Sequence, residues 1–189
     1  MSTAVMLERM AEASPRFKAR IAAVFYLLTF VTGIFALVLV NGRHVANLAG
    51  TACYVAVILL SYHLFKAVNR SVSLLAACFG LVGCAVGALS SFHLAPLRIN
   101  SLVFFGFYCP LIGYLIFRSI FPPRILGVLM MFAGLGWLTF VSARVATYLS
   151  PYNMLPGIVG EGALTLWLLA MGVNGERWKK QSEVIGRRG

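Results

Sequence analysis

The sequence predicts an all-α fold, a polytopic membrane protein built as a six-helix transmembrane bundle with both termini cytoplasmic. Two features of the composition lead to this fold class. Of the 189 residues, 60% are hydrophobic and only 11% are charged, whereas soluble domains average about 45–50% apolar and about 25% charged residues. The apolar residues also form long runs in which polar and apolar positions do not alternate. This excludes a transmembrane barrel and leaves helices as the spanning elements.

Six apolar runs are each close to the roughly 20 residues that a helix needs to cross the hydrocarbon core. They are Ile21–Val40, Val45–Phe65, Val72–Ala95, Ile99–Phe117, Ile125–Leu149 and Met154–Val173. The links between them are short, so consecutive helices are expected to be antiparallel neighbours. We therefore divide the chain into a cytoplasmic segment at residues 1–20, a six-helix transmembrane domain at 21–173 and a basic cytoplasmic tail at 174–189.

The runs carry features typical of helices in such a bundle. The first run exceeds the roughly 7–15 apolar residues of a cleaved signal peptide. The third contains Gly83 and Gly87 in a GxxxG step, and small residues let helices approach closely in lipid. Gly106 and Gly113 lie two turns apart in the fourth run and predict close packing in the same way. The fifth run follows Pro123, which suits the first turn of a helix.

The net charge of +11 follows the predicted topology. Only Arg43, Arg98 and Arg144 lie toward one face of the membrane. The basic residues of the other face are Arg9, Arg16, Lys18, Arg20, Lys66, Arg70, Arg118, Arg124, Arg177, Lys179, Lys180, Arg187 and Arg188. The positive-inside rule makes that face cytoplasmic, and anionic lipid heads attract it. We therefore expect the protein to lie in the bacterial cytoplasmic (inner) membrane, with membrane lipid as a partner. We expect it not to bind nucleic acid.

Several kinds of chemistry find no support in the sequence. The four cysteines (Cys53, Cys78, Cys84 and Cys109) form no CxxC pair and are interpreted as small packing residues. The chain has no aspartate, no HExxH motif, no glycine-rich phosphate loop and no lysine in mid-span. We therefore expect no metal and no cofactor.

One acidic residue stands inside an otherwise apolar run. Glu161, in "PGIVGEGALTLWLL", lies about 10 Å inside the sixth run, and Arg144 lies about 7 Å inside the fifth, at 1.5 Å per residue. An ionisable group inside a span is costly unless it is paired or faces water. Because the two runs are antiparallel neighbours, the sequence predicts that Arg144 and Glu161 contact each other.

Other polar and aromatic residues are predicted to gather with this pair in the outer half of the bundle. Glu161, Arg144 and His93 are the candidate catalytic residues. The candidate substrate-binding residues are Trp137, Phe140, Tyr108, Tyr148, Asn100, Ser90 and Tyr54.

Three functions stay open at this point. In the first, a polar intramembrane pocket near the outer face, at Glu161 and Arg144, binds or transforms a lipophilic or amphipathic small molecule. Glu161 then acts as an acid or base in an isomerisation or cyclisation. In the second, the protein transports or exports a small molecule. In the third, it is a structural or regulatory protein, and Arg144 and Glu161 form an ion pair that only sets helix packing. Whether the protein is an enzyme, and in what oligomeric state, is left undecided.

Several ordered motifs resemble the domain-of-unknown-function 4386 family of small bacterial membrane proteins. The motifs are "ARIAAVFYLLTFVTGIFA", "FKAVNRSVSLLAACF", "LVFFGFYCPLIGYLIFRSIFPPRILGVLMMFAGLGWL" and "PGIVGEGALTLWLLAMGV". The resemblance extends from about Ala19 to Val173. It implies the six-helix arrangement, and it implies that Glu161 belongs to the family's pattern.

Overall fold

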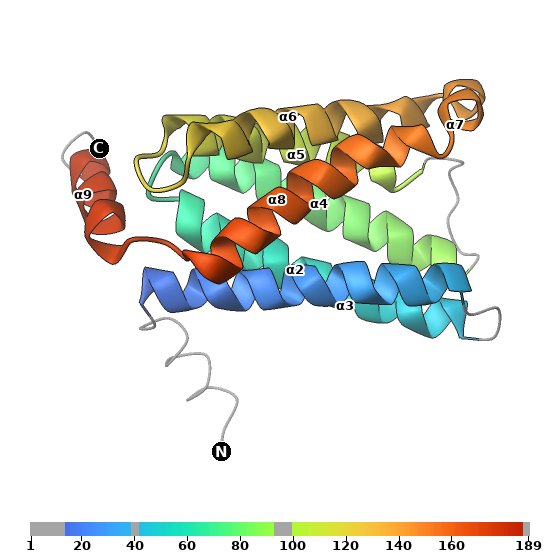
Figure 1. The fold of residues 1–189 in the computed structure, drawn as a ribbon, viewed down its shortest axis with the longest axis horizontal. Helices are drawn as coiled ribbons and strands as arrows, with labels where there is room; N and C mark the ends of the chain where they lie inside the picture. The colour runs from blue at the N-terminus through green and yellow to red at the C-terminus, as the bar shows by residue number, and fades with distance from the viewer. Residues whose placement is uncertain (1–13, 39–41, 93–99, 187–189) are drawn as a thin grey trace, which may run out of the picture.

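The structure is a computed structural model that describes residues 14–38, 42–92 and 100–186. These residues form helices and connecting turns (Figure 1). The long apolar helices are α2 (Pro15–Val38), α3 (Arg43–Phe65), α4 (Arg70–Ser91), α5 (Leu102–Arg118), α6 (Arg124–Leu138) and α8 (Leu155–Ala170). The shorter elements are the 3-10 turns Thr139–Val141 and Tyr152–Met154, helix α7 (Ala143–Leu149) and helix α9 (Gly175–Gly186).

The long helices have the length and composition of membrane spans. Five segments are long and apolar enough to cross a membrane: α2, α3, α4, α6 with its following turn, and α8 with its preceding turn. The sixth, α5, is a shorter apolar helix of 17 residues. The all-α multi-pass membrane fold expected from the composition is confirmed.

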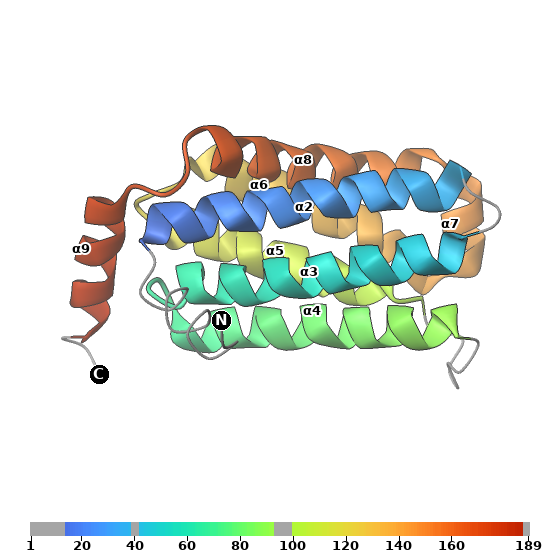
Figure 2. The ribbon, with the colours of Figure 1, turned by 90° about the horizontal axis from the view of Figure 1, so that it is seen from below.

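The six helices form a closed ring in chain order. Each helix packs against the one before it, and α8 closes the ring by packing against both α6 and α2. Figures 1 and 2 show consecutive helices running antiparallel along one long axis, and in Figure 1 α8 crosses the bundle obliquely from α6 to α2. Short links between consecutive helices favour antiparallel packing of neighbours.

The first and last helices of the ring meet at the same end of the bundle. The start of α2, the links α3–α4 and α5–α6 and the end of α8 all lie there (left in Figure 1). The basic residues Arg16, Lys66, Arg118 and Arg124 belong to these segments. We call this end the basic end, and we call the other end, where α7 lies, the α7 end. Helix α2 begins at Pro15, before the predicted start at Ile21.

Glycines set the closest helix contacts, as their pattern predicted. A Cβ on Gly113 would lie 2.6 Å from the carbonyl oxygen of Gly127, and one on Gly106 would lie 2.8 Å from the side chain of Leu138. Any larger residue would therefore push α5 away from α6. Gly83 packs closely against Phe104 and Phe105 of α5, whereas a Cβ on Gly87 would lie 3.5 Å from the side chain of Ser101, which is an ordinary contact.

The fifth predicted run is not one helix. Helix α6 ends at Leu138, a 3-10 turn follows, and Ser142 has extended backbone angles of φ −115° and ψ 120° before α7 begins. The hydroxyl of Thr139 donates to the carbonyl of Gly136 at 2.7 Å, and the amide of Asn153 donates to the Thr139 hydroxyl at 3.2 Å. A straight helix of 25 residues would measure about 37 Å, longer than the roughly 30 Å hydrocarbon core. The chain therefore leaves the span early.

Candidate functional site

Glu161 lies at the centre of the bundle and is only 5% exposed. Three side chains donate to its carboxylate. The indole nitrogen of Trp137 lies 2.7 Å from Oε1, the hydroxyl of Tyr54 lies 3.1 Å from Oε2, and the Cys109 sulfur lies 3.6 Å from Oε1. An indole N–H can only donate a hydrogen bond, so Oε1 is an acceptor in this arrangement. The buried acidic group is thus paired with neutral donors.

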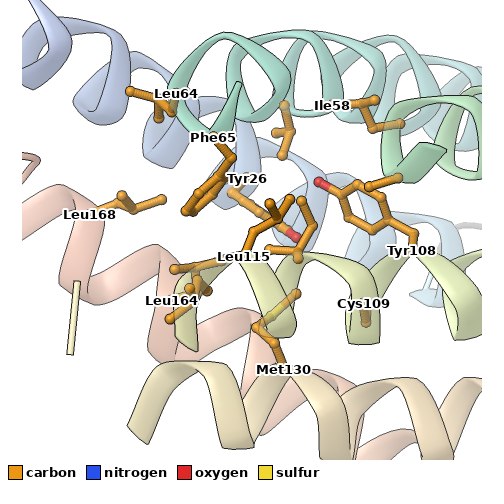
Figure 3. Close-up of a cluster of buried hydrophobic side chains, with 14 of the residues drawn as sticks. Tyr26, Ile58, Leu64, Phe65, Tyr108, Cys109, Leu115, Met130, Leu164 and Leu168 are labelled. Atoms are coloured by element: carbon orange, nitrogen blue, oxygen red, sulfur yellow. The ribbon is translucent and has the colours of Figure 1, made fainter. Parts of the chain in front are cut away.

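A second tyrosine extends this set of hydrogen bonds. The hydroxyl of Tyr26 lies 3.3 Å from that of Tyr54. We call Glu161, Tyr54, Trp137, Cys109 and Tyr26 the Glu161 network. Its members come from α8, α3, α6, α5 and α2, so the network connects five of the six helices in the ring. Figure 3 shows Tyr26 and Cys109 within the buried cluster that these helices enclose.

Two glycines of α8 explain how the network is assembled. The indole ring of Trp137 occupies the space that a Cβ on Gly157 would need. Gly157 lies one helical turn before Glu161, on the same face of α8, so the ring crosses α8 there and its nitrogen reaches the carboxylate. Gly160 packs against the backbone carbonyl of Leu129 in α6. Gly162, in contrast, has open space where its Cβ would be.

Aromatic rings surround the polar atoms of the network. The ring of Tyr54 lies 4.7 Å from that of Phe105, 5.5 Å from that of Tyr26 and 6.1 Å from that of Tyr108, all edge to face. Edge-to-face rings at these distances stabilise one another beyond simple burial. Tyr54 is therefore held in place by its ring as well as by its hydroxyl.

A crevice of about 240 Å³ runs between α2, α3, α4 and α5 and reaches Tyr54. Its lining includes the polar residues Thr29, Thr32, Asn47, Thr51 and Ser101, together with Leu102 and Phe105. A second hollow of about 360 Å³ shares part of this lining and adds His44, Ser90 and Ser91. We call the first hollow the crevice and the second the vestibule. Tyr54 both lines the crevice and donates to Glu161.

The predicted contact between Arg144 and Glu161 is wrong. Arg144 is exposed on α7, at one end of the bundle, while Glu161 is buried among the long helices. No ion pair joins the two within the described residues. The reason is the break at Ser142, which takes Arg144 out of the fifth span and away from the depth that a continuous helix would have given it.

The remaining predicted site residues divide into three groups. Trp137 and Tyr54 bind Glu161 directly, and Phe140 lies next to Trp137 with 6.2 Å between ring centroids. Tyr108 is buried beside Tyr54, and Ser90 lines the vestibule. Tyr148 and Asn100 do not join the site. Tyr148 is 88% exposed on α7, Asn100 is exposed and accepts from the backbone N–H of Leu102, and His93 lies outside the described residues.

Two members of the network, Tyr26 and Cys109, were not among the residues predicted from the sequence. A signal for Tyr26 was present, because Ala19, Ala22, Ala23 and Tyr26 follow helical spacing and form the buried face of α2, each at most 1% exposed. No comparable signal marked Cys109, since a cysteine in an apolar helix is usually a packing residue.

The arrangement is suited to holding a proton or an ionised carboxylate inside the bundle. Tyr54 lies between the crevice and Glu161, and its hydroxyl contacts Glu161 on one side and Tyr26 on the other. A polar group bound in the crevice would meet Tyr54 first. Acidic residues inside a bundle are frequent members of the chains that move protons in membrane proteins.

Comparisons with known proteins agree with the resemblance seen in the sequence. A protein of Archaeoglobus fulgidus (strain ATCC 49558 / DSM 4304 / JCM 9628 / NBRC 100126 / VC-16), whose name is "Uncharacterized protein", is 24% identical over 177 residues, which cover 87% of this chain and 97% of the relative. No solved structure matches the chain. The sequence model of the family described as "Domain of unknown function (DUF4386)" matches residues 99–172, which contain Cys109, Trp137 and Glu161, and confirms the resemblance over that stretch.

Proposed function

We propose that the protein binds a lipophilic or amphipathic small molecule in the crevice, with Tyr54 as its polar contact and Glu161 behind Tyr54. The observation that carries this proposal is the double role of Tyr54, which lines a cavity and donates to a buried carboxylate at 3.1 Å. A carboxylate that only holds helices together would need no cavity beside its hydrogen-bond partner. Ionisable groups inside a membrane protein that adjoin a cavity are typical of ligand and proton sites.

The size and lining of the crevice suggest what part of a ligand it holds. Sites for whole drug-sized ligands measure about 300–1,000 Å³, and the crevice measures about 240 Å³. Its lining mixes threonine and asparagine side chains with Phe105 and Leu102. We infer that the crevice takes one polar group and a short apolar stretch of the molecule, and that a longer tail extends into the vestibule or the lipid.

The chemistry and the location belong to the same proposal. Glu161 would act as the acid or base for an isomerisation or cyclisation of the bound molecule, with Tyr54 carrying the proton between them.

We place the protein in the bacterial cytoplasmic membrane with both termini in the cytoplasm, because the basic end holds the start of α2 and the end of α8. Between the crevice and the basic end, the bundle is filled by side chains such as Leu64, Leu115 and Leu168. Because a transporter needs access from both sides, this filling favours binding over transport.

A structural role is the second candidate, and one observation favours it. The Glu161 network draws on five helices, so the carboxylate could act only to fix which helices touch. Hydrogen bonds to a charged group contribute about 1.5–3 kcal/mol each. On this alternative, the crevice is a packing defect without a ligand.

A pair of glycine variants tests the crevice. Gly33 lines the crevice and Gly162 does not, and a Cβ at either position meets no atom within 4 Å. Gly33→Leu should therefore partly fill the crevice without disturbing its neighbours, and Gly162→Leu is the matched control. Native mass spectrometry of the detergent-purified proteins should find a co-purified molecule on the wild type and on Gly162→Leu, but not on Gly33→Leu. No bound molecule on the wild type, or equal amounts on all three proteins, would refute the proposal.

Glu161→Gln separates the two candidates. Glutamine keeps the size of the side chain and removes its charge and titrating proton. If the site binds a ligand, the variant should melt within a few degrees of the wild type and lose the co-purified molecule. If Glu161 only holds helices together, the melting temperature should fall by many degrees, and the folded fraction should carry the same co-purified molecules as the wild type, if the wild type carries any. Arg144→Gln is the control, because Arg144 is exposed and touches none of the network.

A further inference from the structure

A large hollow lies at the basic end, far from the Glu161 network. It measures about 980 Å³ and is bordered by the start of α2, the α5–α6 link, the end of α8 and the first turn of α9. Its apolar lining includes Phe121, Trp167, Met171 and Val173. Three cationic side chains complete the lining, namely Arg16 of α2 and Arg177 and Lys179 of α9. The hollow thus combines an apolar surface with positive charge.

Helix α9 is held in place to form one wall of this hollow. The indole nitrogen of Trp178 donates to the carbonyl of Leu64 at 2.9 Å. Leu64 lies in the last turn of α3, where backbone carbonyls lack partners within the helix. At the start of α9, the side chain of Asn174 accepts from the backbone N–H groups of Glu176 and Arg177 at 3.0 and 3.2 Å. Hydrogen bonds therefore fix both the start of α9, through Asn174, and its position against α3, through Trp178.

A tight turn directs α9 across the end of the bundle. Gly172 follows α8 with φ of 63°, the left-handed conformation that favours glycine at the end of a helix. Figures 1 and 2 both show α9 running across the long axis of the bundle. Since the long helices cross the membrane, α9 lies along the membrane surface, the position of an interfacial helix.

The apolar lining continues onto the lipid-facing surface of the bundle. Ile120 is 51% exposed and Met171 is 66% exposed, and both line the hollow. An acyl chain lying against the bundle can therefore reach the hollow without crossing a polar rim. Within the described residues, Arg16, Arg177 and Lys179 form no ion pair, and Glu176 is the one acidic residue in the lining. The cationic groups are available to a ligand.

We propose that this hollow binds an anionic phospholipid, with its phosphate between Arg16, Arg177 and Lys179 and its acyl chain along Ile120 and Met171. Charge complementarity selects the headgroup, because each Lys or Arg near an anionic membrane surface strengthens attraction about fivefold. The apolar lining selects a lipid over a free anion. The site is independent of the crevice, which lies in the other half of the bundle.

The test measures lipid binding to the full-length protein in neutral detergent by native mass spectrometry and thermal shift. Dioleoyl phosphatidylglycerol, dioleoyl phosphatidylcholine and inorganic phosphate are added in separate arms. We expect phosphatidylglycerol to bind at least tenfold more tightly than phosphatidylcholine and to raise the melting temperature, and phosphate to do neither. Equal binding of the two lipids, or an equal effect of phosphate alone, would overturn the proposal.

Variants connect the effect to the hollow. Arg16→Gln combined with Arg177→Gln should weaken phosphatidylglycerol binding about 25-fold, at about fivefold for each charge. Lys180→Gln is the matched control, since Lys180 is exposed on α9 and does not line the hollow. If the double variant does not fold, Lys179→Gln alone should weaken binding about fivefold. Weakening of about fivefold by Lys180→Gln, the effect of losing one charge, would show a diffuse basic surface and refute the site.

The chain's own first residues are the competing occupant. A variant that lacks residues 2–13 should bind phosphatidylglycerol as the full-length protein does. Binding that occurs only after this deletion would mean that the segment fills the hollow, and the lipid proposal would be wrong.

Discussion

At the scale of single residues, one missing side chain determines the geometry of the buried carboxylate. Gly157 leaves the space that the indole ring of Trp137 occupies, and that ring brings Nε1 to 2.7 Å from Glu161. Glycine in a helix ordinarily destabilises it by about 1 kcal/mol relative to alanine. The presence of glycine at position 157 is explained by its close contact with the indole ring of Trp137 and not by a need for backbone flexibility.

This contact predicts the effect of Gly157→Ala. The added methyl group overlaps the indole ring, so Trp137 must move and its hydrogen bond to Glu161 must lengthen or break. Losing a hydrogen bond costs about 0.5–1.5 kcal/mol when Glu161 is protonated and about 1.5–3 kcal/mol when it is ionised. We expect a lower melting temperature and a shifted fluorescence emission of Trp137, measured in a variant in which Trp167 and Trp178 are replaced by phenylalanine.

Gly162→Ala in the same background is the control for helix propensity. A Cβ on Gly162 has open space, so this variant should be as stable as its parent or slightly more stable. If Gly157→Ala were equally harmless, the close contact between Gly157 and Trp137 would not be important for stability.

At the scale of elements, α7 decides which polar residues can reach the site. The helix is exposed along its whole length except for Ala146, which is half-buried, and Asn153 binds its backbone through the carbonyl of Ala146 at 3.5 Å. Its residues Arg144 and Tyr148 therefore face outward. The apolar run that includes them is continuous in sequence but consists of a span and a surface helix.

The separation of α7 from α6 predicts different chemical accessibility along one apolar run. Arg144→Cys should react readily with a membrane-impermeant maleimide, because α7 lies at the membrane surface. Leu135→Cys, in α6 and 61% exposed in the structure, should not react, because its exposed face lies in lipid. The unsubstituted protein measures labelling of the native cysteines. Protection of Arg144→Cys to the same degree as Leu135→Cys would contradict the surface position of α7.

At the scale of the whole molecule, the ring of six helices returns the chain to the end where it began. Helix α2 starts and α8 finishes at the basic end (Figure 1). The proposed orientation, in which this end is cytoplasmic, follows from the positive-inside rule. In that orientation the crevice and the vestibule would open in the outer half of the membrane.

Topology reporters test this orientation. Fusions before Met1 and after Gly189 should both report a cytoplasmic location, and a reporter inserted after Ser150 should report the opposite side. Opposite locations for the two terminal fusions would imply an odd number of spans and contradict the ring. Two external termini would keep the ring but reverse its orientation.

Much of the molecule could be predicted from the sequence alone. Apolar runs of sufficient length must become helices in lipid, because every backbone polar group has to be satisfied within the segment. Short links then make neighbours antiparallel. Glu161 stood out for a similarly local reason, since a carboxylate in an apolar run needs a partner wherever the run folds.

What only the tertiary structure decided is the identity of those partners. Arg144 was the opposite charge expected at the depth of Glu161, but the helix breaks at Ser142 and neutral donors from three other helices bind Glu161 instead. Spacing along a helix determines which residues share a face. It does not determine how deep the helix runs or which distant helix faces it. Those depend on close packing, here on the contacts that Gly157 and Gly160 permit, and such packing is a property of the whole bundle.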